Sequence, residues 1–156
     1  MKIAYSRRTV LGVLAATGLC SAAMAGVLDW YNGVKLGSKL PVFETTIISG
    51  EVLPEDSLTL IDFWATWCAP CRESIPRLNE LHDKYRGKGL SVVGLTQEKQ
   101  EVAKPFLLKV PMRYTVGAGD QKNLQAALGI KALPYAIFVN RAGTIVWRGQ
   151  PEEINV

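Results

Sequence analysis

A strand that leads directly into a pair of cysteines, and then into a helix, constrains the fold of this chain more than any other feature. Residues 58–64 form an apolar run, Leu-Thr-Leu-Ile-Asp-Phe-Trp, with the length and composition of a buried strand. Cys68 and Cys71 follow with two residues between them, and residues 73–85 repeat apolar side chains at helical spacing. A dithiol at such a junction can be both exposed and acidified, so the unit predicts thiol–disulfide exchange chemistry.

The order of the other elements predicts an α/β fold in which helices flank a mixed central sheet. Residues 140–143, Asn-Arg-Ala-Gly, suit a hairpin turn between the last two strands. Further strands are expected over residues 45–48 (a short edge strand), 90–95, 112–116, 135–139 and 144–148, and further helices over residues 101–109 and 121–128.

The N-terminal segment has the pattern of an export signal. Lys2, Arg7 and Arg8 precede an uncharged stretch over residues 10–28, and residues 23–25 read Ala-Met-Ala, an A-x-A cleavage pattern. We therefore expect a signal peptide over residues 1–25, or alternatively an uncleaved membrane anchor that extends to about residue 28. The adjacent arginines leave twin-arginine and general export both open. A linker is expected over residues 26–39 and the folded domain over residues 40–156, in the periplasm.

Charge and cysteine content exclude several classes of function. Three of the four net positive charges come from the leader, because the chain without its first three basic residues has 15 basic and 14 acidic side chains. No basic tract suggests a nucleic-acid partner. The predicted domain keeps only Cys68, Cys71 and one histidine, which are too few for a disulfide scaffold or a four-ligand zinc site. No metal or other cofactor is therefore predicted.

The position of each cysteine predicts its chemical role. Cys68 comes at the start of the helix, where unpaired N–H groups and the helix dipole favour a thiolate, so it is the expected nucleophile. Cys71 lies one turn later and is expected to be more enclosed and to resolve the mixed disulfide. Pro70 sets the backbone φ angle at the helix start. Trp67 is either an exposed contact for a partner or part of the core. A chance cysteine pair in the core and a metal clip are the alternatives for the dithiol.

Residues 63–72, Phe-Trp-Ala-Thr-Trp-Cys-Ala-Pro-Cys-Arg, resemble the thioredoxin superfamily, and most closely its TlpA/ResA-type extracytoplasmic thiol–disulfide oxidoreductases. The resemblance covers about residues 40–149 and implies a thioredoxin-like fold. Residues 99–116 are similar to the helix–strand insertion of those proteins. The resemblance also implies a cis-proline loop facing the dithiol, which Leu133-Pro134 matches, with the main chain of Leu133 offered to an extended partner peptide. The alternative is a trans proline that only begins the following strand.

Asp62 is the only charged residue in its apolar strand, so burial should raise its pKa. The resemblance assigns the matching aspartate to proton transfer at the second cysteine, whereas the alternative is an outward-facing residue at a strand end. The chain departs from the family pattern at Ser74, where TlpA/ResA-type proteins often have a glutamate; Glu73 is one residue too early to replace it. A second departure is that the usual closing helix is absent or vestigial, which could leave one sheet face exposed.

Together these features favour an enzyme that exchanges thiols and disulfides with substrate proteins outside the cytoplasm, most simply as a reductase. An oxidising compartment would then require a membrane electron donor to re-reduce the dithiol. The direction of electron flow and the identity of the partner stay open. A Cu(I) carrier is the first alternative, because soft thiolates suit that ion and Met112 could assist, although a core position is expected for Met112. A non-catalytic adaptor that uses an exposed sheet face is the second.

Overall fold

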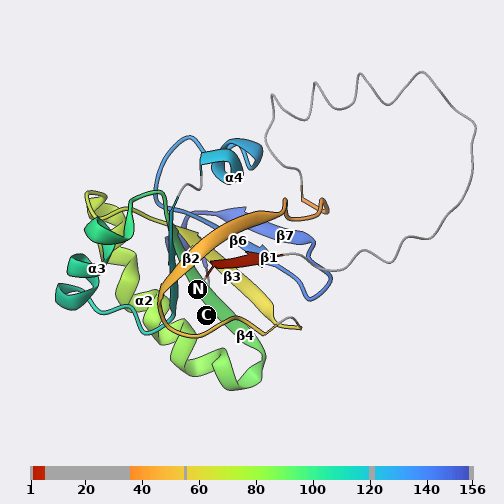
Figure 1. The fold of residues 1–156 in the computed structure, drawn as a ribbon. Helices are drawn as coiled ribbons and strands as arrows, with labels where there is room; N and C mark the ends of the chain where they lie inside the picture. Colours follow the sequence, from red (N-terminus) through yellow and green to blue (C-terminus); the bar gives the residue numbers. More distant parts are fainter. Residues whose placement is uncertain (1, 6–35, 55, 120–121, 155–156) are drawn as a thin grey trace, which may run out of the picture.

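The computed structural model describes residues 2–5, 36–54, 56–119 and 122–154, which form a mixed sheet covered by helices on both faces (Figure 1). The sheet has seven strands in the order β1-β2-β5-β4-β3-β6-β7. The strands are β1 (Lys2–Tyr5), β2 (Phe43–Ser49), β3 (Leu58–Phe63), β4 (Leu90–Thr96), β5 (Thr115–Ala118), β6 (Tyr135–Val139) and β7 (Ile145–Gly149).

The helices follow the order that the sequence predicts. They are α2 (Ala69–Tyr85), the 3-10 turn η1 (Arg86–Lys88), α3 (Gln100–Lys109), α4 (Lys122–Ala127) and the 3-10 turn η2 (Pro151–Glu153). Helices α2 and α3 pack on one face of the sheet and α4 on the other (Figure 1). The predicted thioredoxin-like α/β fold with a mixed central sheet is confirmed.

Strand β3 is central to this arrangement. It pairs in parallel with β4 and antiparallel with β6, and five of its six residues are buried. Alternate residues point to opposite faces. Leu60 lies in the core cluster beneath α2, whereas Ile61 and Phe63 lie in the cluster beneath α4. The apolar run in the sequence therefore reflects burial from both sides.

Three predicted elements need correction. Helix α2 begins at Ala69 rather than at residue 73, because Pro70 fits the first turn of a helix, where its missing N–H costs nothing. Strand β5 begins at Thr115 rather than at residue 112, and Met112 is a buried core residue just before it. Strand β2 is not at an edge, because β1 pairs with it.

The segments just before β2 and just after β7 also pack against the domain. Gly37 N–H donates to the carbonyl of Ile145 at 2.8 Å, and Leu40 N–H donates to the carbonyl of Gly143 at 2.9 Å. The folded domain thus includes residues 37–39, which the prediction assigned to the linker. Ile154 is buried against the α2 face just after η2, so the expected exposure of this face is reduced, although within residues 150–154 the 3-10 turn η2 is the one helical element that follows β7.

Most of the predicted leader lies outside the described residues. Strand β1 belongs to the segment predicted as a signal peptide, so cleavage after residue 25 would remove it and leave β2 at the edge. Among the described residues, no helix combines the length and hydrophobicity that a bilayer span requires.

Candidate active site

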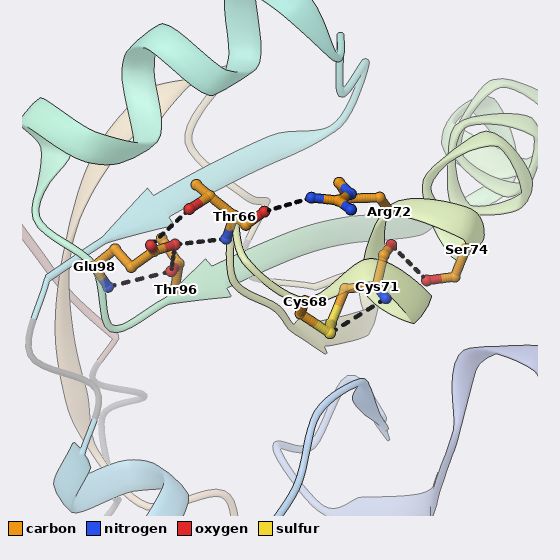
Figure 2. Close-up of a disulfide and its surroundings, with 7 residues drawn as sticks. All are labelled: Thr66, Cys68, Cys71, Arg72, Ser74, Thr96 and Glu98. Atoms are coloured by element: carbon orange, nitrogen blue, oxygen red, sulfur yellow. Dashed lines mark hydrogen bonds between the residues drawn. A yellow bond between two sulfur atoms is a disulfide. The ribbon is translucent and has the colours of Figure 1, made fainter.

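The two cysteines of the motif lie where β3 ends and α2 begins, and they form a disulfide (Figure 2). Cys68 is the N-cap residue of α2, and its Sγ accepts a hydrogen bond from the backbone N–H of Cys71 at 3.3 Å. An N-cap side chain faces the unpaired N–H groups and the positive end of the helix dipole. The geometry therefore favours negative charge on Cys68 in the reduced protein.

The dithiol is more enclosed than the sequence suggested. The disulfide-bonded Cys68 is 3 % exposed and Cys71 is fully buried, so the predicted difference between the two is present but small. The flanking Ala69 and Pro70 are exposed instead. Access to the sulfurs is therefore confined to the surface immediately around Cys68.

Trp67 projects from that surface. Its side chain is 71 % exposed, whereas the other tryptophan of the motif, Trp64, is fully buried. The alternative that Trp67 packs in the core is therefore wrong. A large exposed aromatic ring beside a reactive sulfur is suited to contact with another molecule.

The Leu133–Pro134 peptide bond is cis, as the resemblance implied. It immediately precedes β6, whose first residue, Tyr135, pairs with Phe63 at the end of β3. The proline loop consequently lies at the same end of the sheet as the dithiol. Trp67 and Leu133 are among the residues that line one groove of about 490 Å³ at this end.

Asp62 is fully buried, and neither carboxylate oxygen has a hydrogen-bond partner among the described residues. Burial raises the pKa of Asp62 to about 8, and the negative charge of Glu152 adds to the increase. By the alternation along β3, the side chain lies on the α2 face, where Cys71 is also buried. The alternative of an outward-facing residue is therefore wrong, and the predicted rise in pKa is confirmed.

Two further buried polar groups gather close to Asp62. Gly94 is its register partner on β4. A side chain added at Gly94 would meet Trp64 Nε1 at 3.0 Å and Tyr114 Cε2 at 3.2 Å. The Trp64 Nε1 atom and the Tyr114 hydroxyl are both buried without a partner among the described residues. Burial raises the pKa of Tyr114 well above its usual value, and the charge of Asp62 contributes. The sequence carried no signal for Tyr114, because it read as one more apolar residue.

A second carboxylate, Glu98, lies just after β4 and contacts the loop between β3 and α2 (Figure 2). It accepts hydrogen bonds from the backbone N–H and the hydroxyl of Thr66, each at 2.7 Å, and from the hydroxyl of Thr96 at 3.3 Å. On the other side of the loop, the guanidinium of Arg72 donates to the carbonyl of Thr66 at 3.1 Å. No pattern in the sequence pointed to a role for Glu98, Thr96 or the Thr66–Arg72 contact.

Ser74 occupies the position where the resemblance led us to expect a glutamate. It is buried, and its hydroxyl donates to the carbonyl of Cys71 at 2.9 Å (Figure 2). Glu73 is exposed and points away from the core, as its offset in the helix predicted. Met112 is a member of the core cluster, as expected. Within the described part of the chain, no three His, Cys, Asp or Glu side chains are grouped to hold a metal ion.

A family model described as the AhpC/TSA family matches residues 37–148. The chain is similar to the thiol-disulfide oxidoreductase ResA of Bacillus anthracis, with 26 % identity over 118 residues that cover 72 % of this chain and 68 % of the relative. It is also similar to ResA of Bacillus thuringiensis subsp. konkukian, with 25 % identity over 148 residues that cover 89 % and 86 % of the two chains.

Solved structures with the same fold include a chain from Chlorobium tepidum described as a thiol:disulfide interchange protein DsbE. It is 29 % identical, with a TM-score of 0.63 over 74 % of this chain and 85 % of that one. The thioredoxin domain of a thiol-disulfide oxidoreductase from Bacteroides vulgatus is 21 % identical, with a TM-score of 0.68 over 79 % and 91 % of the two chains. This second likeness supports the fold alone.

Proposed function

Because the chain belongs to the AhpC/TSA family of thioredoxin-like proteins, and its cysteine pair is bonded at the N-terminus of α2, we propose that it is a thiol–disulfide oxidoreductase that reduces disulfides in substrate proteins. The single observation that carries the proposal is the placement of Cys68 as the N-cap of a long helix. This position supplies both the acidity and the limited access that an exchanging thiol needs.

In the proposed reaction, the Cys68 thiolate attacks one sulfur of a substrate disulfide. A bond forms between Cys68 Sγ and that sulfur, the substrate's own S–S bond breaks, and the released thiolate takes up a proton. The thiolate of Cys71 then attacks Cys68 Sγ, which forms the intramolecular disulfide and releases the second substrate thiolate. Two electrons pass from the dithiol to the substrate, so the substrate is reduced and the dithiol oxidised.

Asp62 is proposed to accept the proton that Cys71 must lose before it attacks. A carboxyl group whose pKa lies near 8 exchanges a proton close to neutral pH, which suits a general acid–base. The proton then passes to the departing substrate thiolate. The support for this role is that Asp62 and Cys71 are both buried on the α2 face of the sheet.

The substrate is proposed to bind as an extended segment in the groove beside the dithiol. Trp67 and Pro70 are exposed close to Cys68 in the sequence and would provide an apolar contact. Leu133 lines the groove and would offer its main-chain groups, with Pro134 holding the loop at the start of β6. Main-chain recognition would make binding tolerant of substrate sequence.

The domain is proposed to act in the periplasm as a reductase. The support is the export pattern of residues 1–25, whether cleaved or retained as an anchor to about residue 28, and the resemblance to extracytoplasmic proteins. The dithiol would become oxidised in an oxidising compartment. A membrane electron donor with a more reducing dithiol is therefore proposed to re-reduce it.

The test combines turnover with a redox potential. The reduced chain should reduce insulin disulfides, and Cys68→Ser should abolish that activity, whereas an adaptor would keep its function. A Cys71→Ser variant should accumulate the mixed disulfide. A potential near that of thioredoxin, about −270 mV, supports the reductase direction, and one near DsbA, about −120 mV, reverses it. Stoichiometric Cu(I) binding without turnover would favour a carrier instead.

A further inference from the structure

We infer that Glu98 is a positioning residue for the thiol exchange. It holds Thr66 in place, and through Thr66 it fixes the adjoining Trp67 and Cys68 in the position that attack on a bound substrate disulfide requires. The inference rests on the proposed function, because it concerns the geometry of the same reaction. Glu98 belongs to the segment that follows β4, and it is 32 positions along the chain from Thr66, the residue that it holds.

Both carboxylate oxygens of Glu98 accept a hydrogen bond from this loop. One carboxylate oxygen takes the backbone N–H of Thr66 and the other takes the Thr66 hydroxyl, both at 2.7 Å. Hydrogen bonds to an ionised acceptor at this distance are short and about twice as strong as neutral ones. The Thr96 hydroxyl and the N–H of Glu98 itself complete a small ring that fixes the carboxylate to the end of β4.

Thr66 is held from its other side as well. Arg72 donates from its guanidinium to the Thr66 carbonyl at 3.1 Å and from its backbone N–H to the Cys68 carbonyl at 3.2 Å. Figure 2 shows Thr66 between Glu98 and Arg72, with Cys68 at the following turn. All three backbone or side-chain polar groups of Thr66 are therefore bonded to residues outside the loop. We call this set of bonds the Thr66 clamp.

The clamp compensates for the lack of packing around Trp67. The Trp67 side chain is 71 % exposed, so it does not anchor its own backbone. The residue before it is the clamped Thr66, and the residue after it is Cys68 at the cap of α2. Glu98 also lines the substrate groove together with Trp67 and Leu133. The position of the Trp67 ring relative to Leu133 in the groove therefore depends on the clamp.

In-line attack on a disulfide requires alignment of three sulfur atoms, and a misplacement of about 1 Å can cost about 100-fold in rate. A small alkylating reagent has no such requirement, because it approaches Cys68 without docking in the groove. Loss of the clamp should therefore slow exchange with a protein disulfide much more than it slows alkylation. A residue that tuned thiol acidity would instead change both rates together.

The experiment compares Glu98→Gln with Glu101→Gln in the full chain. Glu101 is exposed in the first turn of α3 and is matched in chemical change. We expect Glu98→Gln to lower kcat/KM for insulin reduction about tenfold, or about 1.4 kcal/mol in barrier, while Cys68 alkylation by iodoacetamide changes less than about threefold. Exchange of the Thr66 amide hydrogen should quicken at least about tenfold as its acceptor weakens. Glu101→Gln should match the unaltered chain in all three measurements.

Equal losses in turnover and alkylation would overturn the inference, as would an unchanged exchange rate of the Thr66 amide hydrogen or unchanged turnover.

If Glu98→Gln does not fold, Thr66→Val and Thr66→Ser provide the test. Serine keeps the hydroxyl donor and should keep the activity, valine should lose most of it, and equal activity of the two contradicts the clamp. Amide exchange and alkylation need no substrate, so they test the clamp even if the unaltered chain fails to reduce insulin, which would refute the proposed function alone.

Discussion

The carboxyl groups of Asp62 and Glu98 lie near the ends of the neighbouring strands β3 and β4, and they differ in burial and in hydrogen bonding. Glu98 follows β4, is half-buried, and receives hydrogen bonds from one N–H and two hydroxyl groups. Asp62 lies in β3, is fully buried, and neither of its oxygens has a partner among the described residues. The same chemical group is thus supported as an anion in one region and deprived of support in the other.

The two carboxyl groups show how a small domain separates two tasks. A carboxylate that accepts several hydrogen bonds can hold a backbone segment in place. A carboxyl that is buried without donors has its pKa raised to about 8, so it can take up or release a proton near neutral pH. The Glu98 region therefore suits positioning and the Asp62 region suits proton transfer. Four substitutions, two in each region, test this contrast.

Asp62→Asn should produce the largest effect, and its sign should be a gain in stability. The folded pKa of Asp62 lies above the unfolded value of 3.8, so the folded chain binds the extra proton between about pH 4 and 8. Over that window, stability of the unaltered chain falls as pH rises, by at most about 1.4 kcal/mol per pH unit from this group. Below pH 4 the group is protonated in both states and contributes nothing to the difference.

The measurement is the free energy of unfolding by denaturant at pH 4 and pH 8 for both chains. Asp62→Asn should equal the unaltered chain at pH 4 and exceed it by several kcal/mol at pH 8, while the second step of disulfide exchange slows at least about tenfold. A difference that is the same at both pH values would show that the carboxyl group does not titrate in this window, and it would remove Asp62 from the proposed proton transfer.

Glu98→Gln should have the opposite sign. Glutamine loses the charge and one acceptor while it keeps the shape, so the Thr66 and Thr96 donors are less well satisfied. We expect a loss of about 1–3 kcal/mol in the free energy of unfolding at pH 7, where the carboxylate's charge-assisted bonds are intact. A stability equal to that of the unaltered chain would mean that water replaces the bonds at no cost, and the contrast with Asp62 would fail.

Gly94→Ala tests how closely the Asp62 region is packed. The added carbon would lie 3.0 Å from Trp64 Nε1 and 3.2 Å from Tyr114 Cε2, so both rings must shift by a few tenths of an ångström. We expect a loss of about 1 kcal/mol from overpacking, measured by denaturant unfolding. Gly87→Ala is the matched control, because nothing lies within 4 Å of its added carbon. If the two alanine variants were equally stable, the region around Asp62 would be looser than the structure indicates.

The parts of the site that could be predicted are those encoded by local sequence patterns. The apolar run of residues 58–64 predicted β3, and the single charge within this otherwise apolar strand favoured a buried Asp62 with a raised pKa over an outward-facing one. The family resemblance implied a cis bond at Leu133-Pro134, which lies directly before a strand, whereas the sequence by itself left a trans bond open; the bond is cis.

The remainder depends on contacts between residues that are distant in sequence. Glu98 and Thr66 are 32 positions apart, and nothing near either residue marks it as the other's partner. Trp67 could not be placed, because an aromatic residue after a turn is equally compatible with core and surface until the path of α2 is known. The start of β5 was misplaced because Met112 and Tyr114 are buried without being in a strand, so apolar character alone suggested one.

Trp67→Ala should have the smallest effect on stability and still impair function. Because the side chain is 71 % exposed, its removal should change the free energy of unfolding by no more than about 0.5 kcal/mol. Its loss should raise KM for a protein disulfide about tenfold and leave the reduction of a small disulfide such as oxidised glutathione nearly unchanged. Val146→Ala, an exposed apolar residue on β7, is the control and should alter neither activity. Equal losses with both substrates would mean that Trp67 acts on the sulfur chemistry itself. The Glu98 region would then affect the chemical step as well as the position of the substrate.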